Sequence, residues 1–379
     1  MSLVIHDLTP EEWRERGAAY EGWDVVADTG AIRPCVGCFA CWDKTPGECV
    51  LRDGFGDMGA RIHRADEVHV ISRYTCGGFS GFVKNVFDRS LGYVLPQFEV
   101  VNGETHHLRR YDEDKPFTFI FRGAALTEDE KASARRYVTA VCANIRGHVK
   151  DVLFREDGAP AAPARRAAGE GRLLLLNGSM RCASGNSAKL ARELARRLRR
   201  TPEAVNLRDY LSDLTALVRE LETADTLVLC APLYVDGMPS QVVRLMERVQ
   251  AEYQGGRLRV YVLANMGLYE SRQLVNLFDA ARQWCHAVGF DCCGGLGVSA
   301  GELLGVLMEH IPFRLGATRD AARGMDALAN AIDTGAALGD LYAEPRGFPR
   351  ALFTLVANVS WNRSARKNGL APKELYRRL

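Results

Sequence analysis

Short apolar runs alternate with helix-like runs in the second half of this sequence, and this alternation constrains the fold more than any other feature. After the apolar run "RLLLLNG" comes "SAKLARELARRLRR", in which Leu190, Leu194 and Leu198 recur on one helix face. The last helix-like run is closed by Gly289 as a C-terminal cap. Such alternation predicts a parallel sheet covered by helices on both faces. The strand-like runs are 172–178, 225–234 and 258–265, and the helix-like runs are 187–200, 240–249 and 271–289.

The first half repeats this alternation more loosely, with a polar excursion at 93–116. The segment "YTCGGFSGFVKNVFDRS" (74–90) aligns with "LYVDGMPSQVVRLMERV" (233–249). Each has a strand end, a loop with Gly, a Ser, an apolar helix and an acid–Arg pair. This match predicts an internal duplication of one domain type.

A segment rich in Ala, Pro, Gly and charge, "REDGAPAAPARRAAGEG", separates the two halves. It has no apolar period, so we expect a flexible linker that does not pack in a core. The sequence therefore predicts a first domain at 1–154, a linker at 155–171, a second domain at 172–345 and a basic tail at 346–379.

Composition narrows the class of protein. The chain has 379 residues, is 47% hydrophobic and 25% charged, and carries a net charge of +2. No apolar run approaches the roughly 18 residues of a membrane span, and the start lacks the layout of a signal peptide. We therefore expect a cytoplasmic protein with no membrane and no nucleic-acid partner. In a reducing compartment its 11 cysteines favour thiols or metal ligands over disulfides.

The segment "NGSMRCASGNS" (177–187) lies between a predicted strand and its helix. A helix N-terminus offers unpaired N–H groups and the positive end of a dipole, and the hydroxyl side chains add donors. This suits a terminal phosphate, although a helix cap in a polar turn explains the residues equally well. The segment matches neither the dinucleotide-fold nor the Walker pattern.

These residues resemble the flavodoxin-like NAD(P)H-dependent FMN reductase superfamily. "APLYVDGMPSQVVRLMER" (231–248) is similar to the family's second flavin loop, and "NMGLYE" (265–270) to its third. The resemblance covers about 172–340 and implies two flavodoxin-like doubly wound α/β domains in tandem, the second of which binds FMN. It implies phosphate contacts from Ser179, Arg181, Ser184, Asn186 and Ser187, and ring contacts from Pro232, Leu233, Tyr234, Gly237 and Met238, with Asn265 and Gly267 in the third loop. Asp236 differs from the family, in which a small or polar residue is common at this position. A carboxylate here would disfavour a flavin anion.

Four cysteines lie within "CVGCFACWDKTPGEC", at Cys35, Cys38, Cys41 and Cys49. The spacing resembles that of iron–sulfur flavoproteins, which implies four thiolate ligands for a [4Fe–4S] cluster. Reduced thiols in a loop that packs over the flavin remain the alternative, and zinc is a further one. The adjacent Cys292 and Cys293 are assigned no redox role.

The first half lacks the phosphate loop. Glu11 and Glu12 stand where Gly, Asn and Ser would be expected, and carboxylates at a helix N-terminus repel phosphate. We therefore expect the first domain not to bind FMN in the usual way. It would serve as a cluster domain, a dimer-like partner or a lid.

The resemblance implies an FMN-dependent NAD(P)H oxidoreductase that passes electrons to a small molecule or a redox protein. No acid–base residue stands out in the sequence. An iron–sulfur flavoprotein electron carrier and a non-catalytic flavin sensor are the alternatives. Either a homodimer or a pairing of the two domains within one chain would complete the site.

Overall fold

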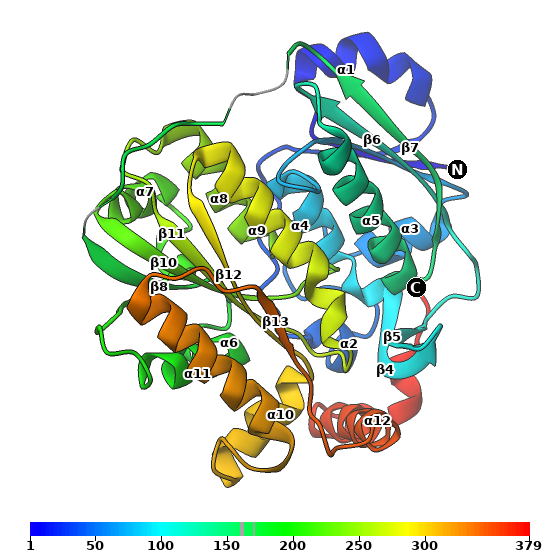
Figure 1. Cartoon of the computed structure of the whole chain (residues 1–379). Coiled ribbons are helices and arrows are strands. Elements are labelled where there is room, and N and C mark those ends of the chain that lie inside the picture. Colours follow the sequence, from blue (N-terminus) through cyan, green and yellow to red (C-terminus); the bar gives the residue numbers. More distant parts are fainter. Residues whose placement is uncertain (160–162, 170) are drawn as a thin grey trace. The chain divides into compact units, whose positions relative to one another are not determined.

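The computed structural model describes residues 1–159, 163–169 and 171–379. The chain forms two compact units, Met1–Pro160 with Thr354–Leu379, and Ala161–Phe353. Each unit contains its own parallel sheet (Figure 1). None of the helices in the described residues is long and apolar enough to cross a bilayer.

The first unit has the strand order β2-β1-β3-β6-β7, with every neighbouring pair parallel. This is the 2-1-3-4-5 order of flavodoxin-like folds. Its elements are β1 (Leu3–His6), α1 (Pro10–Arg16), η1 (Gly17–Tyr20), β2 (Asp24–Ala27), α2 (Ala40–Asp43), α3 (Met58–Arg64), β3 (Val68–Arg73), α4 (Gly81–Arg89), η2 (Leu91–Tyr93), β4 (Val94–Val101), β5 (Glu104–Arg109), β6 (Pro116–Gly123), α5 (Glu128–Asn144) and β7 (His148–Glu156).

The second unit has the order β13-β12-β11-β10-β8-β9, again parallel throughout. Its elements are β8 (Arg172–Asn177), η3 (Cys182–Ser184), α6 (Asn186–Ala195), β9 (Glu203–Asn206), η4 (Leu207–Tyr210), α7 (Leu214–Glu222), β10 (Ala224–Pro232), α8 (Ser240–Glu252), β11 (Arg259–Asn265), η5 (Ser271–Leu274), α9 (Val275–Val288), β12 (Asp291–Val298), α10 (Gly301–His310), η6 (Gly316–Thr318), α11 (Arg319–Thr334) and β13 (Asp340–Ala343). The prediction of two flavodoxin-like α/β domains is confirmed.

Helices cover both faces of the second sheet, with α8 and α9 on one face and α6 and α11 on the other (Figure 1). Side chains alternate along β8, so Leu173 and Leu175 pack in one core cluster with Leu190 and Leu194 of α6. α9 ends at Gly289, whose φ of 73° lies in the left-handed region. The predicted cap and the core positions of Leu190 and Leu194 are therefore present, whereas Leu198 lies beyond the end of α6 and packs against the same cluster from there.

Three segments differ from expectation. Residues 93–116 contain the antiparallel pair β4–β5, which buries Thr105 and His106, instead of a solvated excursion. The predicted linker falls partly on 160–162 and 170, which lie outside the described residues. Its residues 163–169 are bound to the second unit, since Arg166 donates to the backbone oxygens of Val288, Gly255 and Tyr253.

The predicted basic tail forms helix α12 (Arg350–Lys367) and η7 (Pro372–Tyr376). Its residues from Thr354 onward belong to the first unit. Asn358 bonds to both the N–H and the C=O of Phe98, and Leu375 is fully buried. The tail is therefore part of a folded core, although its basic composition gave no sign of this.

Candidate functional site

Three loops of the second unit meet at the carboxyl ends of β8, β10 and β11. Gly178 N–H donates to Cys230 O at 2.7 Å, and Leu233 N–H donates to Asn265 O at 2.7 Å. Ser187 Oγ, in the first turn of α6, donates to Asn265 Oδ1 at 2.6 Å. In open parallel sheets this edge is where ligands bind.

The first loop has a fixed shape because its own groups bond to one another. Ser179 N–H donates to Asn177 Oδ1 at 3.1 Å, Arg181 N–H donates to Ser179 Oγ at 3.3 Å, and Ser184 Oγ donates to Arg181 O at 2.8 Å. A Cβ on Gly185 would lie 3.0 Å from Ser179 Oγ. The glycine of the Ser-Gly-Asn-Ser motif thus allows the loop to close onto the helix.

The N-terminus of α6 is open to an anion. Gly185 is the N-cap of this ten-residue helix, and no described side chain accepts a hydrogen bond from its first turn. Ser184 is exposed, and Arg181 Nη1 lies 3.1 Å from Glu302 Oε1 in a surface ion pair. The donors near this end are backbone N–H groups, hydroxyls and one guanidinium, a set that suits a phosphate.

The two other predicted phosphate contacts, Asn186 and Ser187, face neighbouring elements. Ser187 is buried against Asn265. The side chain of Asn186 faces α10, because a Cβ on Gly305 would lie 2.2 Å from Asn186 Oδ1. Of the five residues, Ser184 is exposed and Arg181 and Asn186 are half-buried, whereas Ser179 and Ser187 are buried.

The second loop contains a strained turn. Tyr234 and Gly237 exchange two backbone hydrogen bonds of 3.0 Å, and the residues between them have positive φ, 38° for Val235 and 59° for Asp236. A β-branched residue with positive φ is an outlier, and such strain clusters at functional sites. The half-buried Pro232, Leu233 and Tyr234 flank this turn.

The remaining predicted ring contacts differ in exposure. Met238 is 2% exposed and Gly237 is buried, so the Met238 side chain belongs to the core. Asn265 is buried at the end of β11, whereas Gly267 is exposed with no atom within 4 Å of an added Cβ. Gly267 is thus the open part of the third loop.

Sequence reasoning did not assign a fourth loop that follows β12 to the site. Ala300 has a φ of 50°, and its N–H donates to Leu268 O at 2.7 Å. Gly301 N–H donates to Met266 O, also at 2.7 Å. In the sequence, the pair of small residues Ala300 and Gly301 between a strand and a helix was the signal that could have indicated this loop.

The first unit repeats the second loop. Thr75 and Gly78 exchange backbone hydrogen bonds of 3.0 Å around Cys76 and Gly77, whose φ values are 45° and 86°. The four residues occupy the aligned positions of the Tyr234–Gly237 turn. The predicted duplication therefore extends to backbone conformation.

The first loop is not repeated. The N-terminus of α1 is occupied by its own capping box, in which Glu12 N–H donates to Thr9 Oγ1 and Thr9 N–H donates to Glu12 Oε2. Arg122 pairs with both Asp7 and Glu12 at the same edge of the sheet. Carboxylates thus occupy the donors that a phosphate would need.

The four clustered cysteines lie on a loop around the short helix α2. Cys38 is exposed and the other three are half-buried. Burial raises the pKa of Cys35 to about 12, with the charge of Asp88 and then Cys49 and Cys38 adding to it. Burial also holds the pKa of Cys41 well above its usual value, again with the other three thiols contributing. The four thiols therefore influence one another electrostatically.

Two arginines flank this loop. Arg89 Nε donates to Cys49 Sγ at 3.2 Å, and the positive charge of Arg110 acts on Cys41. Within 1–159, 163–169 and 171–379, however, no three His, Cys, Asp or Glu residues are grouped as they would be around a metal ion. As they lie, the thiols do not form the ligand set that a cluster requires.

Comparisons with known proteins bear on the second unit. Residues 172–292 match the family model described as NADPH-dependent FMN reductase. No curated protein matches the chain. The matched structures include the Trp repressor binding protein from Bacillus subtilis, at 17% identity and TM-score 0.33, over 41% of this chain and 99% of that one. Another is an FMN-dependent NADH-azoreductase from Bacillus anthracis str. Ames Ancestor in complex with FMN, at 14% identity and TM-score 0.33, over 43% of this chain and 100% of that one. The segment that builds the three-loop edge is thus the one that matches the NADPH-dependent FMN reductase family.

Proposed function

We propose that the protein is an FMN-dependent NAD(P)H oxidoreductase that passes electrons to a small molecule or a redox protein. The observation that carries this proposal is the convergence of three loops beside the open N-terminus of α6, within the segment that matches the FMN reductase family. FMN, when bound, supplies the hydride chemistry, and the protein supplies binding, orientation and electrostatics.

The phosphate of FMN would bind at the first turn of α6. The exposed Ser184 offers its hydroxyl there, and the half-buried Arg181 offers its guanidinium. The Arg181–Glu302 ion pair is 35% and 57% exposed at its two side chains, and exposed pairs contribute less than about 1 kcal/mol. Arg181 can therefore exchange Glu302 for a phosphate oxygen at small cost.

The isoalloxazine ring would lie along Pro232, Leu233 and Tyr234. The turn that follows holds these residues at the end of β10, and the Leu233–Asn265 backbone bond fixes them against β11. Gly267 leaves open space beside the third loop, where a nicotinamide could approach. In this arrangement the residues of the chain orient two flat rings and exclude water between them.

A matched pair of variants at Ser184 tests the phosphate site. Asp and Asn have the same shape, so Ser184→Asp and Ser184→Asn differ mainly in charge. A carboxylate beside a phosphate raises the free energy of binding, and we expect FMN affinity to fall about tenfold or more in Ser184→Asp relative to Ser184→Asn. Quenching of flavin fluorescence during titration measures this affinity.

Equal affinities in the two variants would contradict the phosphate placement. NADH and NADPH oxidation by the FMN-loaded wild-type protein tests the activity itself. Binding of FMN with no oxidation of either nucleotide would leave a flavin sensor instead, and no binding of FMN would overturn the whole proposal.

An iron–sulfur electron carrier is the second candidate. The four thiols influence one another electrostatically, and Arg89 and Arg110 act on two of them. These arginines favour the cluster, because cationic neighbours stabilise thiolates. The absence of a ligand grouping among the described residues counts against it. Iron and sulfide assayed after purification without oxygen decide the matter: about four irons per chain would support the cluster, and no iron would leave a thiol loop.

A further inference from the structure

Two further cysteines of the second unit form a pair on the edge of the sheet opposite the three loops. Cys285 lies in the last turn of α9, and Cys292 is the second residue of β12. The three loops lie at the carboxyl ends of the strands, so Cys292 is ~20 Å along the strand from that edge. This pair has no part in the function proposed above.

The local fold brings the two residues together. Gly289 ends α9 in the left-handed conformation, and Phe290 N–H donates to Cys285 O at 2.8 Å as the chain turns into β12. The last turn of the helix therefore lies against the first residues of the strand.

An irregularity in β12 sets the direction of its cysteines. Val260 pairs with Cys292, but Val262 pairs with Gly295, so β12 has one extra residue at this point. Gly294 adopts a φ of 78° there. Such bulges change the direction of side chains. Cys293 packs in the core cluster that includes α11, whereas Cys292 meets α9.

The side chains of Cys285 and Cys292 interact. The Cys285 thiol hydrogen-bonds to the Cys292 sulfur, and this bond is the largest cause that lowers the pKa of Cys292, to about 7. Burial opposes the shift, and the Gly294 N–H and the charge of Arg282 add to it. The neighbouring Cys293 behaves in the opposite way, since burial raises its pKa.

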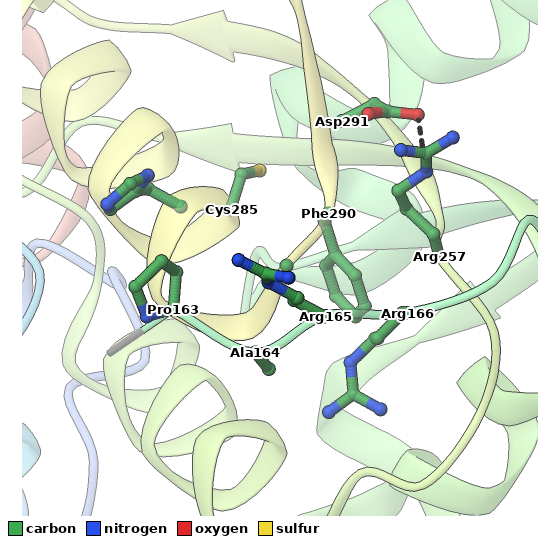
Figure 2. Close-up of a pocket in the computed structure, with 10 residues that line it drawn as sticks. Pro163, Ala164, Arg165, Arg166, Arg257, Cys285, Phe290 and Asp291 are labelled. Carbon is green, nitrogen blue, oxygen red and sulfur yellow. Dashed lines mark ion pairs between the residues drawn. The ribbon is translucent and has the colours of Figure 1, made fainter. Parts of the chain in front are cut away.

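A cavity adjoins one member of the pair, Cys285. Cys285 lines a space of about 340 Å³ between α9, the start of β12 and residues 163–166 (Figure 2). Arg165, Arg166 and Arg257 also line it, and Arg257 pairs with Asp291. Cys292 itself is half-buried. A small oxidant can therefore approach Cys292 from its partly exposed side, next to the buried Cys285.

We propose that Cys285 and Cys292 form a reversible thiol–disulfide site that is oxidised by hydroperoxides. The Cys292 thiolate attacks the distal oxygen of the hydroperoxide, the O–O bond breaks, and the sulfur becomes a sulfenic acid as an alcohol or water leaves. Cys285 sulfur then attacks the sulfenic sulfur, and its proton leaves with the hydroxyl as water. The two thiols lose two electrons, the peroxide gains them, and a dithiol reductant reverses the change.

The test is peptide mapping of the full-length protein after exposure to hydrogen peroxide. Free thiols are alkylated, and mass spectrometry identifies linked peptides. Wild type and Cys293→Ser are expected to form the 285–292 link, and Cys292→Ser and Cys285→Ser are not. In Cys285→Ser, dimedone should label Cys292, because the sulfenic acid has no partner thiol.

The rate of linking gives a second measurement. It should rise about tenfold per pH unit below pH 7 and level off above it, since only the thiolate attacks. The proposal is overturned if peroxide links no peptides in wild type, if the link persists in Cys292→Ser through Cys293, or if the rate keeps rising through pH 9. Circular dichroism of each variant shows whether a lost link reflects lost folding.

Discussion

Arg89 is the residue that most firmly fixes the cysteine loop within the first unit. Its side chain is 0% exposed, and it bonds to both carboxylate oxygens of Asp53, at 2.7 and 2.9 Å. It also donates to Arg33 O at 2.8 Å and to Cys49 Sγ. One buried guanidinium thereby joins α4 to both ends of the Cys35–Cys49 loop.

This pair predicts acid sensitivity of the first unit. Burial opposes ionisation of Asp53, but hydrogen bonds from Arg89, Arg33 and Phe55 outweigh it and lower its pKa to about 2. A lowered pKa stabilises the fold above the unfolded value near 4, and this stability is lost as the pH falls toward 2. Asp53→Asn should lower the free energy of unfolding at pH 7 by about 3 kcal/mol and flatten its pH dependence between 4 and 2.

Urea unfolding across that pH range measures the effect, followed by tryptophan fluorescence because four of the five tryptophans lie in the first unit. Asp112→Asn is the control, since the Asp112 side chain is 83% exposed and pairs with the surface residue Arg378. A pH dependence in Asp53→Asn equal to that of wild type would refute the assignment.

At the scale of elements, two helices in equivalent positions of the two units differ in how their N-termini are capped. α6 begins at Gly185 with no side-chain cap, whereas α1 begins at Thr9 with a complete capping box. The same fold thus leaves the helix after the first strand without a side-chain cap in the second unit and provides a complete one in the first. The acidic residues Glu11 and Glu12 predicted this difference from the sequence, because their charge alone disfavours phosphate.

Sequence reasoning was strongest where the backbone has a period or a fixed motif. The leucines of α6, the cap at Gly289 and the strand–loop–helix order all have local causes, and all are present. It was weakest where distant residues decide burial. His106 lies in a charged stretch, yet it is buried because β4 pairs with β5 and Asn144 bonds its ring.

The site itself shows the same limit. The motif puts Ser179, Arg181 and Ser184 on one loop because it is local, and their contact with a phosphate stays a prediction. The inward direction of Met238 and the contact of Asn186 with Gly305 depend on how α8 and α10 pack, which no local pattern records. The bulge that directs Cys292 toward α9 likewise has no sequence signal beyond two adjacent glycines.

At the scale of the molecule, the first unit is built from both ends of the chain. Residues Thr354–Leu379 complete it, and Arg110 donates to the backbone oxygens of Leu375 and Arg377 at 2.7 and 2.6 Å. Leu379 packs against Gly47 in the cysteine loop. The final residues therefore cover that loop.

Deletion of 375–379 should expose the loop thiols. We expect Cys41 and Cys49 to react with a thiol reagent at least about tenfold faster, since local opening controls access to buried groups. Mass spectrometry of labelled peptides measures each rate. Tyr376→Ala is the control, because Tyr376 is 50% exposed, and the buried Cys230 should stay unlabelled in every folded variant. Unchanged rates at Cys41 and Cys49 would show that the final residues do not protect the loop.

The division of the chain also has a consequence for the order in which the protein is made. The second unit is one continuous stretch, Ala161–Phe353, and can fold as soon as it leaves the ribosome. The first unit starts earlier but cannot be finished until 354–379 have been synthesised. The cysteine loop therefore stays uncovered while nearly two hundred residues are synthesised. During this interval its thiols are most open to metals, oxidants or assembly factors.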